Sequence, residues 1–65
     1  MEIYLGQTYL YRNGRGGMGE LRVTAVNNSN GQEKITVEYD NGKRRTFSRK
    51  EAENRIIRNR WQEVL

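Results

Sequence analysis

The most regular alternation of hydrophobic and polar positions in the chain lies between residues 35 and 47. Ile35, Val37 and Tyr39 alternate with polar residues, and Phe47 ends a second, shorter run on the far side of Asn41-Gly42. A period of two is typical of a strand with one buried face, and Asn-Gly is a strong signal for a tight turn between strands. This stretch is therefore predicted to form a β-hairpin.

The length of the turn decides which side chains share a face of this hairpin. A two-residue loop would place Phe47 on the face away from Ile35, because a shift of one residue moves every side chain to the other face. A three-residue loop over 40–42, with Gly42 in the left-handed conformation, places Phe47 opposite Ile35. We predict the three-residue loop, because it buries the apolar residues of both strands together.

On the face of the hairpin away from Ile35 and Phe47, the same register predicts favourable cross-strand pairs. On the face of Ile35 and Phe47 it predicts a polar corner near the turn. It sets an acid opposite a base and a threonine opposite a threonine (Glu38–Arg44 and Thr36–Thr46). This corner lies beyond the apolar residues on the face of Ile35 and Phe47, and it contains Tyr39, Lys43 and Arg45. This corner is the first candidate site.

The N-terminal half of the chain is predicted to form two further strands around a glycine-rich loop. Residues 3–11 are extended with a turn at Gly6-Gln7, and Tyr9 and Tyr11 share one face. Four glycines between residues 14 and 19 exclude a helix interior or a central strand there. The second of these strands follows over residues 20–26, where Leu21, Val23 and Ala25 alternate, and a polar turn over 27–31 leads into the hairpin.

The glycine-rich loop contains the spacing G-x-G-x-x-G at Gly14, Gly16 and Gly19. In a dinucleotide-binding protein this motif opens a helix, but here the pattern of a strand follows, so the match is interpreted as accidental. Arg12 and Arg15 flank or tip the loop, and two interpretations stay open for them. They are either solvated ends of a flexible loop or contacts to phosphate.

A single short helix is predicted after the hairpin. Ser48 followed three residues later by Glu51 matches a capping box, so the helix runs from about Arg49 to Ile57 or beyond. Ala52 and Ile56 form its inward stripe. Its outward face carries Lys50, Asn54 and Arg58, and Glu51 is expected to pair with Arg55 four residues on.

The last residues, 61–65, are predicted to form a closing segment. Trp61 and Val64 are the apolar residues expected to cover the core from this segment. The short chain is expected to be a single domain, monomeric or homodimeric, over residues 1–65. No signal peptide or membrane span is recognised, so a soluble, intracellular (cytoplasmic) protein is expected.

Composition narrows the classes of function. The 65 residues contain 12 Lys and Arg, most of them arginine, against 8 Asp and Glu, which gives a net charge of +4. An arginine-rich excess favours a polyanionic partner, because guanidinium binds phosphate as a planar fork and stacks on bases. The absence of Cys and His excludes disulfides, thiolate or histidine catalysis and the usual zinc sites. No cofactor is expected.

The predicted order of elements resembles the SH3-like small barrel. The piece from Val37 to Lys43, closing on Phe47, resembles the third and fourth strands of Tudor-like domains, in which an aromatic residue precedes an acidic-glycine turn. Gly6-Gln7-Thr8-Tyr9 is similar to the opening of such barrels and of KOW-type ribosomal modules. The resemblance implies a mainly β fold, a five-stranded SH3-like (Tudor-like) small barrel with one short C-terminal helix.

The resemblance also implies a ligand groove on one rim of the barrel. Tudor-like barrels that read methylated Lys or Arg use an aromatic cage with an acidic residue, for which this chain offers Tyr11, Tyr39, Phe47 and Asp40. The cations of the hairpin, at residues 43–45, would repel such a ligand, and Phe47 is expected in the core because it faces Ile35. Basic versions of the fold bind nucleic acid, which agrees with the charge.

The leading hypothesis is therefore a non-catalytic nucleic-acid-binding barrel whose partner is DNA or RNA. Basic side chains would engage phosphates and tyrosines would stack on a base or ribose. Ion pairs of Arg44 with Glu38 and of Arg55 with Glu51 would reduce the available charge. The candidate binding residues are Arg12, Arg15, Tyr11, Tyr39, Lys43, Arg44, Arg45, Arg49, Lys50 and Arg58.

The sequence also bears on two other classes of function. A small phage-type or mobile-element protein-interaction module, an inhibitor or accessory factor docking on a nucleoprotein complex, would use exposed edge strands. An enzyme is not expected, because acid–base chemistry would fall to carboxylates or tyrosines. Glu38 and Asp40 form the only close acidic pair in a strand and turn, and they are expected to serve Arg44 and the turn.

Overall fold

The hairpin predicted over residues 35–47 is present in the computed structural model, which describes residues 2–12 and 14–64. Strands β3 (Gln32–Tyr39) and β4 (Arg44–Ser48) pair with Ile35 opposite Phe47. The Tyr39 amide donates to the Lys43 carbonyl at 2.8 Å, and Gly42 has a left-handed φ of 85°. The three-residue loop and the predicted register are confirmed.

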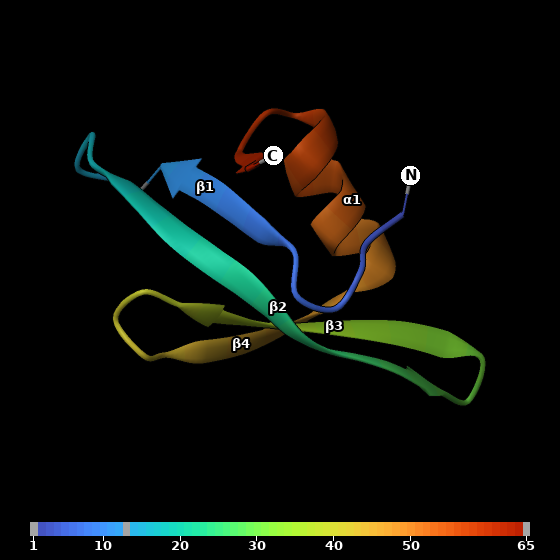
Figure 1. The fold of residues 1–65 in the computed structure, drawn as a ribbon. Helices are drawn as coiled ribbons and strands as arrows, with labels where there is room; N and C mark the ends of the chain where they lie inside the picture. The colour runs from blue at the N-terminus through green and yellow to red at the C-terminus, as the bar shows by residue number, and fades with distance from the viewer. Residues whose placement is uncertain (1, 13, 65) are drawn as a thin grey trace.

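The strands form one antiparallel sheet in the order β4-β3-β2-β1-β5. The remaining strands are β1 (Thr8–Arg12), β2 (Met18–Ser29) and β5 (Trp61–Glu63). In Figure 1 the long β2 crosses the molecule diagonally, with β1 along its first half and β3 along its second. The predicted mainly β architecture with five strands and one short C-terminal helix is confirmed.

Strand β2 corrects three predicted details. It includes Gly19, so the exclusion of a central strand there is wrong, and it continues through residues 27–29, which were predicted to lie in a polar turn. Leu21 and Val23 are buried as expected, but the register shifts between Val23 and Ala25, and Ala25 is only half-buried. Val26 therefore lies opposite Ile35. A bulge inserts one extra residue and increases the local bend, so the alternation predicted through Ala25 is wrong beyond Val23.

The helix α1 (Arg49–Ile57) begins at the predicted capping box. The Ser48 hydroxyl accepts from the Glu51 amide at 3.2 Å, and the Glu51 carboxylate accepts from the Ser48 amide at 3.1 Å. These reciprocal bonds satisfy two backbone donors at the end of the helix. The inward stripe is also confirmed, because Ala52 is fully buried and Ile56 packs against the core.

The helix ends in a Schellman turn that the sequence analysis did not identify. Asn59 has a left-handed φ of 58° and donates its amide to the Ile56 carbonyl at 3.0 Å. The Arg60 amide donates to the Arg55 carbonyl at 2.8 Å. These two bonds satisfy carbonyls at the C-terminus of the helix and reverse the chain toward β5.

Aromatic rings connect the two edge strands of the sheet. Trp61 of β5 lies edge-on to Phe47 of β4 at 5.3 Å between centroids, and Tyr9 of β1 lies 5.8 Å from Trp61. All three residues are at least 96% buried, since their exposures are 2–4%. The sheet must therefore curl enough to bring its edges together on one side.

The curled sheet is not closed by hydrogen bonds in the part of the chain that the structure describes, since β4 pairs with β3 alone and β5 with β1 alone. Helix α1 lies between these edges and contacts β3, β4 and β5 (Figure 1).

The two apolar residues predicted to cover the core from the C-terminal segment differ in burial. Val64 is 45% exposed, so its prediction is wrong, whereas Trp61 is buried as predicted. None of the described helical residues forms a segment long and apolar enough to cross a membrane.

Replacement of Trp61 by alanine is expected to lower the free energy of unfolding by about 3–5 kcal/mol, the usual loss for a buried aromatic residue. The total free energy of unfolding of a chain of this size is roughly 3–10 kcal/mol, so the substitution should remove most of the stability. Urea unfolding followed by circular dichroism measures the change, with Trp61→Phe expected to fall between the alanine variant and the wild type. Val64→Ala is the control and should cost less than about 0.5 kcal/mol, because that side chain is exposed. Equal losses for Val64 and Trp61 would contradict this account of the core.

The capping box is expected to make stability depend on pH through Glu51. Hydrogen bonds with Ser48 lower the pKa of Glu51, and the positive charges of Arg55 and Lys34 add to this effect. A lowered folded pKa adds stability that is complete above the unfolded value of about 4.3 and is lost as the pH falls through the folded value.

The variant Glu51→Gln retains an acceptor for the Ser48 amide but cannot ionise. Its free energy of unfolding is therefore expected to change less than that of the wild type between about pH 5 and pH 3. Glu2→Gln, which removes an exposed acid outside the helix, is the control for the loss of one negative charge. Parallel curves for Glu51→Gln and the wild type would show that the cap does not contribute to the acid dependence.

Candidate nucleic-acid interface

The structure gathers arginines from two distant segments of the chain near the C-terminal end of α1. Arg58 caps the helix, and the Schellman turn at Asn59 brings Arg60 back toward the sheet. Because β5 pairs with β1 through Trp61 and Tyr11, Arg60 lies next to Arg12 just beyond this pair. Residues more than forty positions apart in the chain thus become neighbours.

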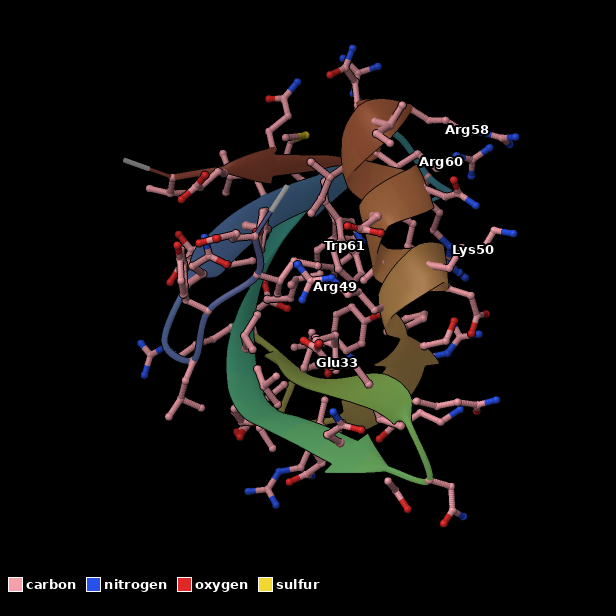
Figure 2. All side chains as sticks on the ribbon, turned by 90° about the vertical axis from the view of Figure 1, so that its right-hand side faces the viewer. Glu33, Arg49, Lys50, Arg58, Arg60 and Trp61 are labelled. Carbon is pink, nitrogen blue, oxygen red and sulfur yellow. The ribbon has the colours of Figure 1, made fainter. Side chains whose placement is uncertain are left out.

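Two hollows lie on this part of the surface and share Arg58 and Arg60. The larger, of about 680 Å³, is lined by Arg12, Gly14, Arg58, Asn59, Arg60 and Gln62. The smaller, of about 250 Å³, is lined by Glu51, Asn54, Arg55, Arg58 and Arg60. We call Arg12, Arg55, Arg58 and Arg60 the arginine surface. Figure 2 shows Arg58 and Arg60 projecting from the same side of α1, with Lys50 farther along that side.

The charge of the arginine surface is offset only in part, by Glu51 of the smaller hollow. The ion pairs seen among the described residues include Arg44–Glu38, Arg49–Glu33 and Arg49–Glu53, and none of these involves a member of this surface. Glu51 lines the smaller hollow, but one of its oxygens accepts from the Ser48 amide. The surface therefore keeps an excess of positive charge that is available to an anion.

Arg55 is held in place by aromatic rings, which corrects its predicted role. Its guanidinium lies 4.4 Å from the centroid of Phe47 and 6.0 Å from that of Trp61. It donates to the backbone carbonyl of Glu51 at 3.3 Å, while the Glu51 carboxylate serves the helix cap. Arg55 thus influences Glu51 electrostatically, but the predicted pair of the two side chains is replaced by a backbone contact.

Arg49 lies apart from the other candidate cations. Its guanidinium donates to Glu33 at 2.6 Å and lies 3.4 Å from Glu53, and both acids are about 70% buried at their side chains. The hydrogen bond with Glu33 raises the pKa of Arg49. Figure 2 shows Arg49 and Glu33 on the inner side of the helix, turned away from Arg58. Because two acids balance its charge, Arg49 is not counted in the arginine surface, and its role in binding phosphate stays a prediction.

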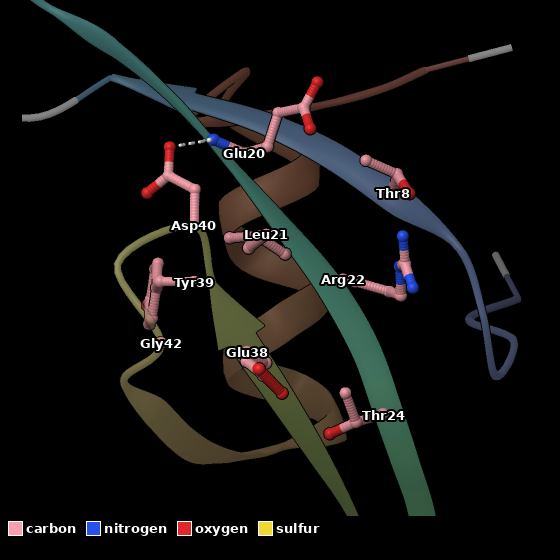
Figure 3. Close-up of a pocket in the computed structure, with 9 residues that line it drawn as sticks. All are labelled: Thr8, Glu20, Leu21, Arg22, Thr24, Glu38, Tyr39, Asp40 and Gly42. Atoms are coloured by element: carbon pink, nitrogen blue, oxygen red, sulfur yellow. Dashed lines mark hydrogen bonds between the residues drawn. The ribbon is translucent and has the colours of Figure 1, made fainter.

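Arg44 points to the face of the sheet away from the helix, where opposite charges are mixed. Its Nε lies 3.4 Å from the Oε2 of Glu38. A hollow of about 340 Å³ on this face, shown in Figure 3, is lined by Thr8, Glu20, Leu21, Arg22, Thr24, Glu38, Tyr39, Asp40 and Gly42. The carboxylate of Asp40 accepts from the Glu20 amide at 3.1 Å. Three acids against one arginine make this hollow unfavourable for a polyanion.

The predicted corner of the hairpin is present on the face that α1 covers. Lys43 is bonded across the turn to Tyr39, and Arg45 lies opposite the buried Val37. The Arg45 guanidinium lies 4.9 Å from the centroid of Phe47, the ring that also holds Arg55. The corner is therefore connected to the arginine surface through Phe47.

Tyr11 and Tyr39 are held against each other at the other side of this corner. Their rings are edge-on with centroids 5.2 Å apart, and both pack against the core. Burial, the charge of Asp40 and a hydrogen bond with that carboxylate raise the pKa of Tyr11. The ring of Tyr11 also covers Gly19, where an added Cβ would lie 2.6 Å from the ring. Gly19 appears in the sequence analysis only as part of a glycine motif. The structure shows that the absence of a side chain at this position leaves the space that the Tyr11 ring occupies.

The other predicted binding residues are exposed. Lys50 lies on the outward face of α1 with Arg58, as expected, and Arg15 is exposed on the loop whose Gly14 lines the larger hollow. The sequence analysis missed Arg60 as a member of the arginine surface. Asn59 was a readable signal for Arg60, because asparagine often adopts the left-handed conformation that ends a helix.

No three acids among residues 2–12 and 14–64 are grouped as a metal site requires.

Comparisons with known proteins assign this chain to no family. No protein-family model, curated protein sequence or solved structure matches the chain.

Substitution of Gly19 by alanine is expected to displace Tyr11 and lower the free energy of unfolding by about 1–2 kcal/mol, because the new methyl group overlaps the ring. Gly14→Ala is the matched control, since nothing lies within 4 Å of a Cβ at that position. In a Tyr11→Leu background the Gly19→Ala substitution should cost clearly less, which a double-mutant cycle by urea unfolding measures. Additive effects of the two substitutions would contradict the predicted contact.

Proposed function

We propose that this chain is a non-catalytic nucleic-acid-binding domain that contacts the phosphates of DNA or RNA through the arginine surface. The observation that carries the proposal is the convergence of Arg12, Arg58 and Arg60 around one hollow, with none of them in an ion pair within the described residues. Guanidinium groups bind phosphate oxygens through two parallel hydrogen bonds. The net charge of +4 supports attraction of a polyanion over a longer range.

The corner of the hairpin extends the proposed interface. Lys43 and Arg45 add positive charge, and the rings of Tyr39 and Tyr11 lie beside them. Aromatic rings stack on bases or riboses without requiring a particular sequence. The interface thus combines phosphate contacts near the helix end with a smaller contribution from the tyrosines.

The fold is proposed to be related to the SH3-like, Tudor-like barrels. The support is the strand order β4-β3-β2-β1-β5 and a short helix that precedes the last strand. The contact of Phe47 with Trp61 brings the two edges of the sheet together in the manner of a small barrel. In this proposal α1 occupies the space between the two edge strands.

A protein-interaction module is the second candidate, supported by the two strands at the sheet edges. Residues 44–46 of β4 are exposed, and every second residue of an edge strand directs its backbone groups outward. A pull-down before and after nuclease treatment separates the two functions, because a protein partner survives the treatment and a nucleic-acid bridge does not.

Removal of two charges from the arginine surface is expected to weaken binding of a labelled oligonucleotide. The double variant Arg58→Gln/Arg60→Gln should lose roughly tenfold or more in affinity, and the slope of log affinity against log salt should decrease by about 1.4–1.8. Fluorescence anisotropy over a series of salt concentrations measures both quantities.

The matched control is Arg22→Gln/Arg44→Gln, which removes the same charge from the face shown in Figure 3. It should reduce affinity only slightly, since these side chains lie among acids. Equal effects of the two double variants would show that binding follows net charge and not the arginine surface. No binding of the wild type at low salt would reject the proposed function.

A further inference from the structure

We propose that the smaller hollow, lined by Arg55, Arg58 and Arg60, binds a terminal phosphate monoester of a nucleic-acid strand. The inference rests on the proposed function and names the chemical group that this part of the interface recognises. An internal phosphate is a diester with one negative charge, whereas a terminal phosphate is a monoester. The second ionisation of a monoester has a pKa of about 6, so it carries about −1.5 to −2 at pH 7.

The charge around the hollow matches a monoester better than a diester. The three guanidinium groups contribute three positive charges and Glu51 one negative charge. The C-terminal end of α1 adds roughly half a negative charge, although the Schellman bonds already occupy two of its carbonyls. The net charge around the hollow is therefore about +1.5. One diester would balance only part of this charge, whereas one monoester would neutralise it.

The hollow is also prepared for an anion before it binds one. Arg55 is held by the rings of Phe47 and Trp61 and by the Glu51 carbonyl, so little of its freedom remains to be lost. The turn through Asn59 is closed by two backbone hydrogen bonds, which fixes the backbone between Arg58 and Arg60. Asn54 lines the same hollow and can supply an amide donor. Bidentate donors suit the three terminal oxygens of a monoester.

The absence of histidine allows a sharp test by pH. No side chain of the protein ordinarily titrates between about pH 5.2 and pH 7.0, because the chain contains neither His nor Cys. The monoester itself changes from about one to nearly two negative charges across this range. A preference that appears as the pH rises through 6 therefore reports the ligand and not the protein.

The experiment compares one labelled oligonucleotide in three forms, with a 5′-phosphate, with a 3′-phosphate and with hydroxyl groups at both ends. Fluorescence anisotropy gives the affinity of each at about pH 5.2 and pH 7.0 in the same salt. At pH 7.0 at least one phosphorylated form is expected to bind about tenfold more tightly than the hydroxyl form. The two phosphorylated arms show which end is recognised, and at pH 5.2 the advantage should fall to less than about threefold.

Variants separate this inference from the proposed function. Arg58→Gln and Arg60→Gln should each abolish most of the preference for the phosphorylated form, while Arg22→Gln, the same change on the other face, should retain it. Arg55 is left intact because it packs on the core rings. Circular dichroism checks that each variant is folded.

The outcomes are distinguishable. Equal binding of all three forms at pH 7.0, still weakened by Arg58→Gln, would overturn the inference and leave the proposed function standing. A preference that persists in Arg58→Gln and Arg60→Gln would also overturn it, because the monoester would then bind elsewhere. No binding of any form at low salt would reject the proposed function and this inference together.

Discussion

The contact between Phe47 and Trp61 is the interaction on which the rest of the molecule depends. These rings come from the two edge strands of the sheet, which no backbone ladder joins in the part of the chain that the structure describes. In a domain of 65 residues the buried area is small, so a few large aromatic side chains must supply much of it. Trp61 contacts Phe47 on one side and Tyr9 on another, and so holds β4, β5 and β1 around one core.

The same rings determine where the positive charges lie. Arg55 from the helix and Arg45 from β4 both place their guanidinium groups over Phe47. Helix α1 begins directly after β4 and ends in the turn that leads to β5, so its C-terminal arginines must lie beside the last strand. The other face of the sheet mixes acids with arginines, as in the pair of Arg44 and Glu38. The positive charges are therefore distributed unevenly, and four arginines that are in none of these ion pairs (Arg12, Arg55, Arg58 and Arg60) gather near the end of α1.

Sequence reasoning predicted best the features that depend on neighbouring residues. The register of Ile35 with Phe47 followed from the parity of the hairpin, and the start of α1 followed from Ser48 and Glu51. It did not identify contacts that a distant residue makes. Arg49 was assigned to the interface because nothing nearby in the chain indicated Glu33, sixteen residues earlier, as its partner. The bulge after Val23 and the exposure of Val64 likewise depend on how the sheet bends.

The sequence by itself determined the elements, since the period of the apolar residues, the turn glycine and the capping pair act within a few residues of one another. It also determined an arginine-rich chain without histidine, and with it the classes of chemistry that are excluded. Only the tertiary structure decided which arginines form one surface, because Arg12 and Arg60 meet through the pairing of β1 with β5. Electrostatic contacts depend on distance in space, and for these residues that distance is set by the curl of the sheet around Trp61.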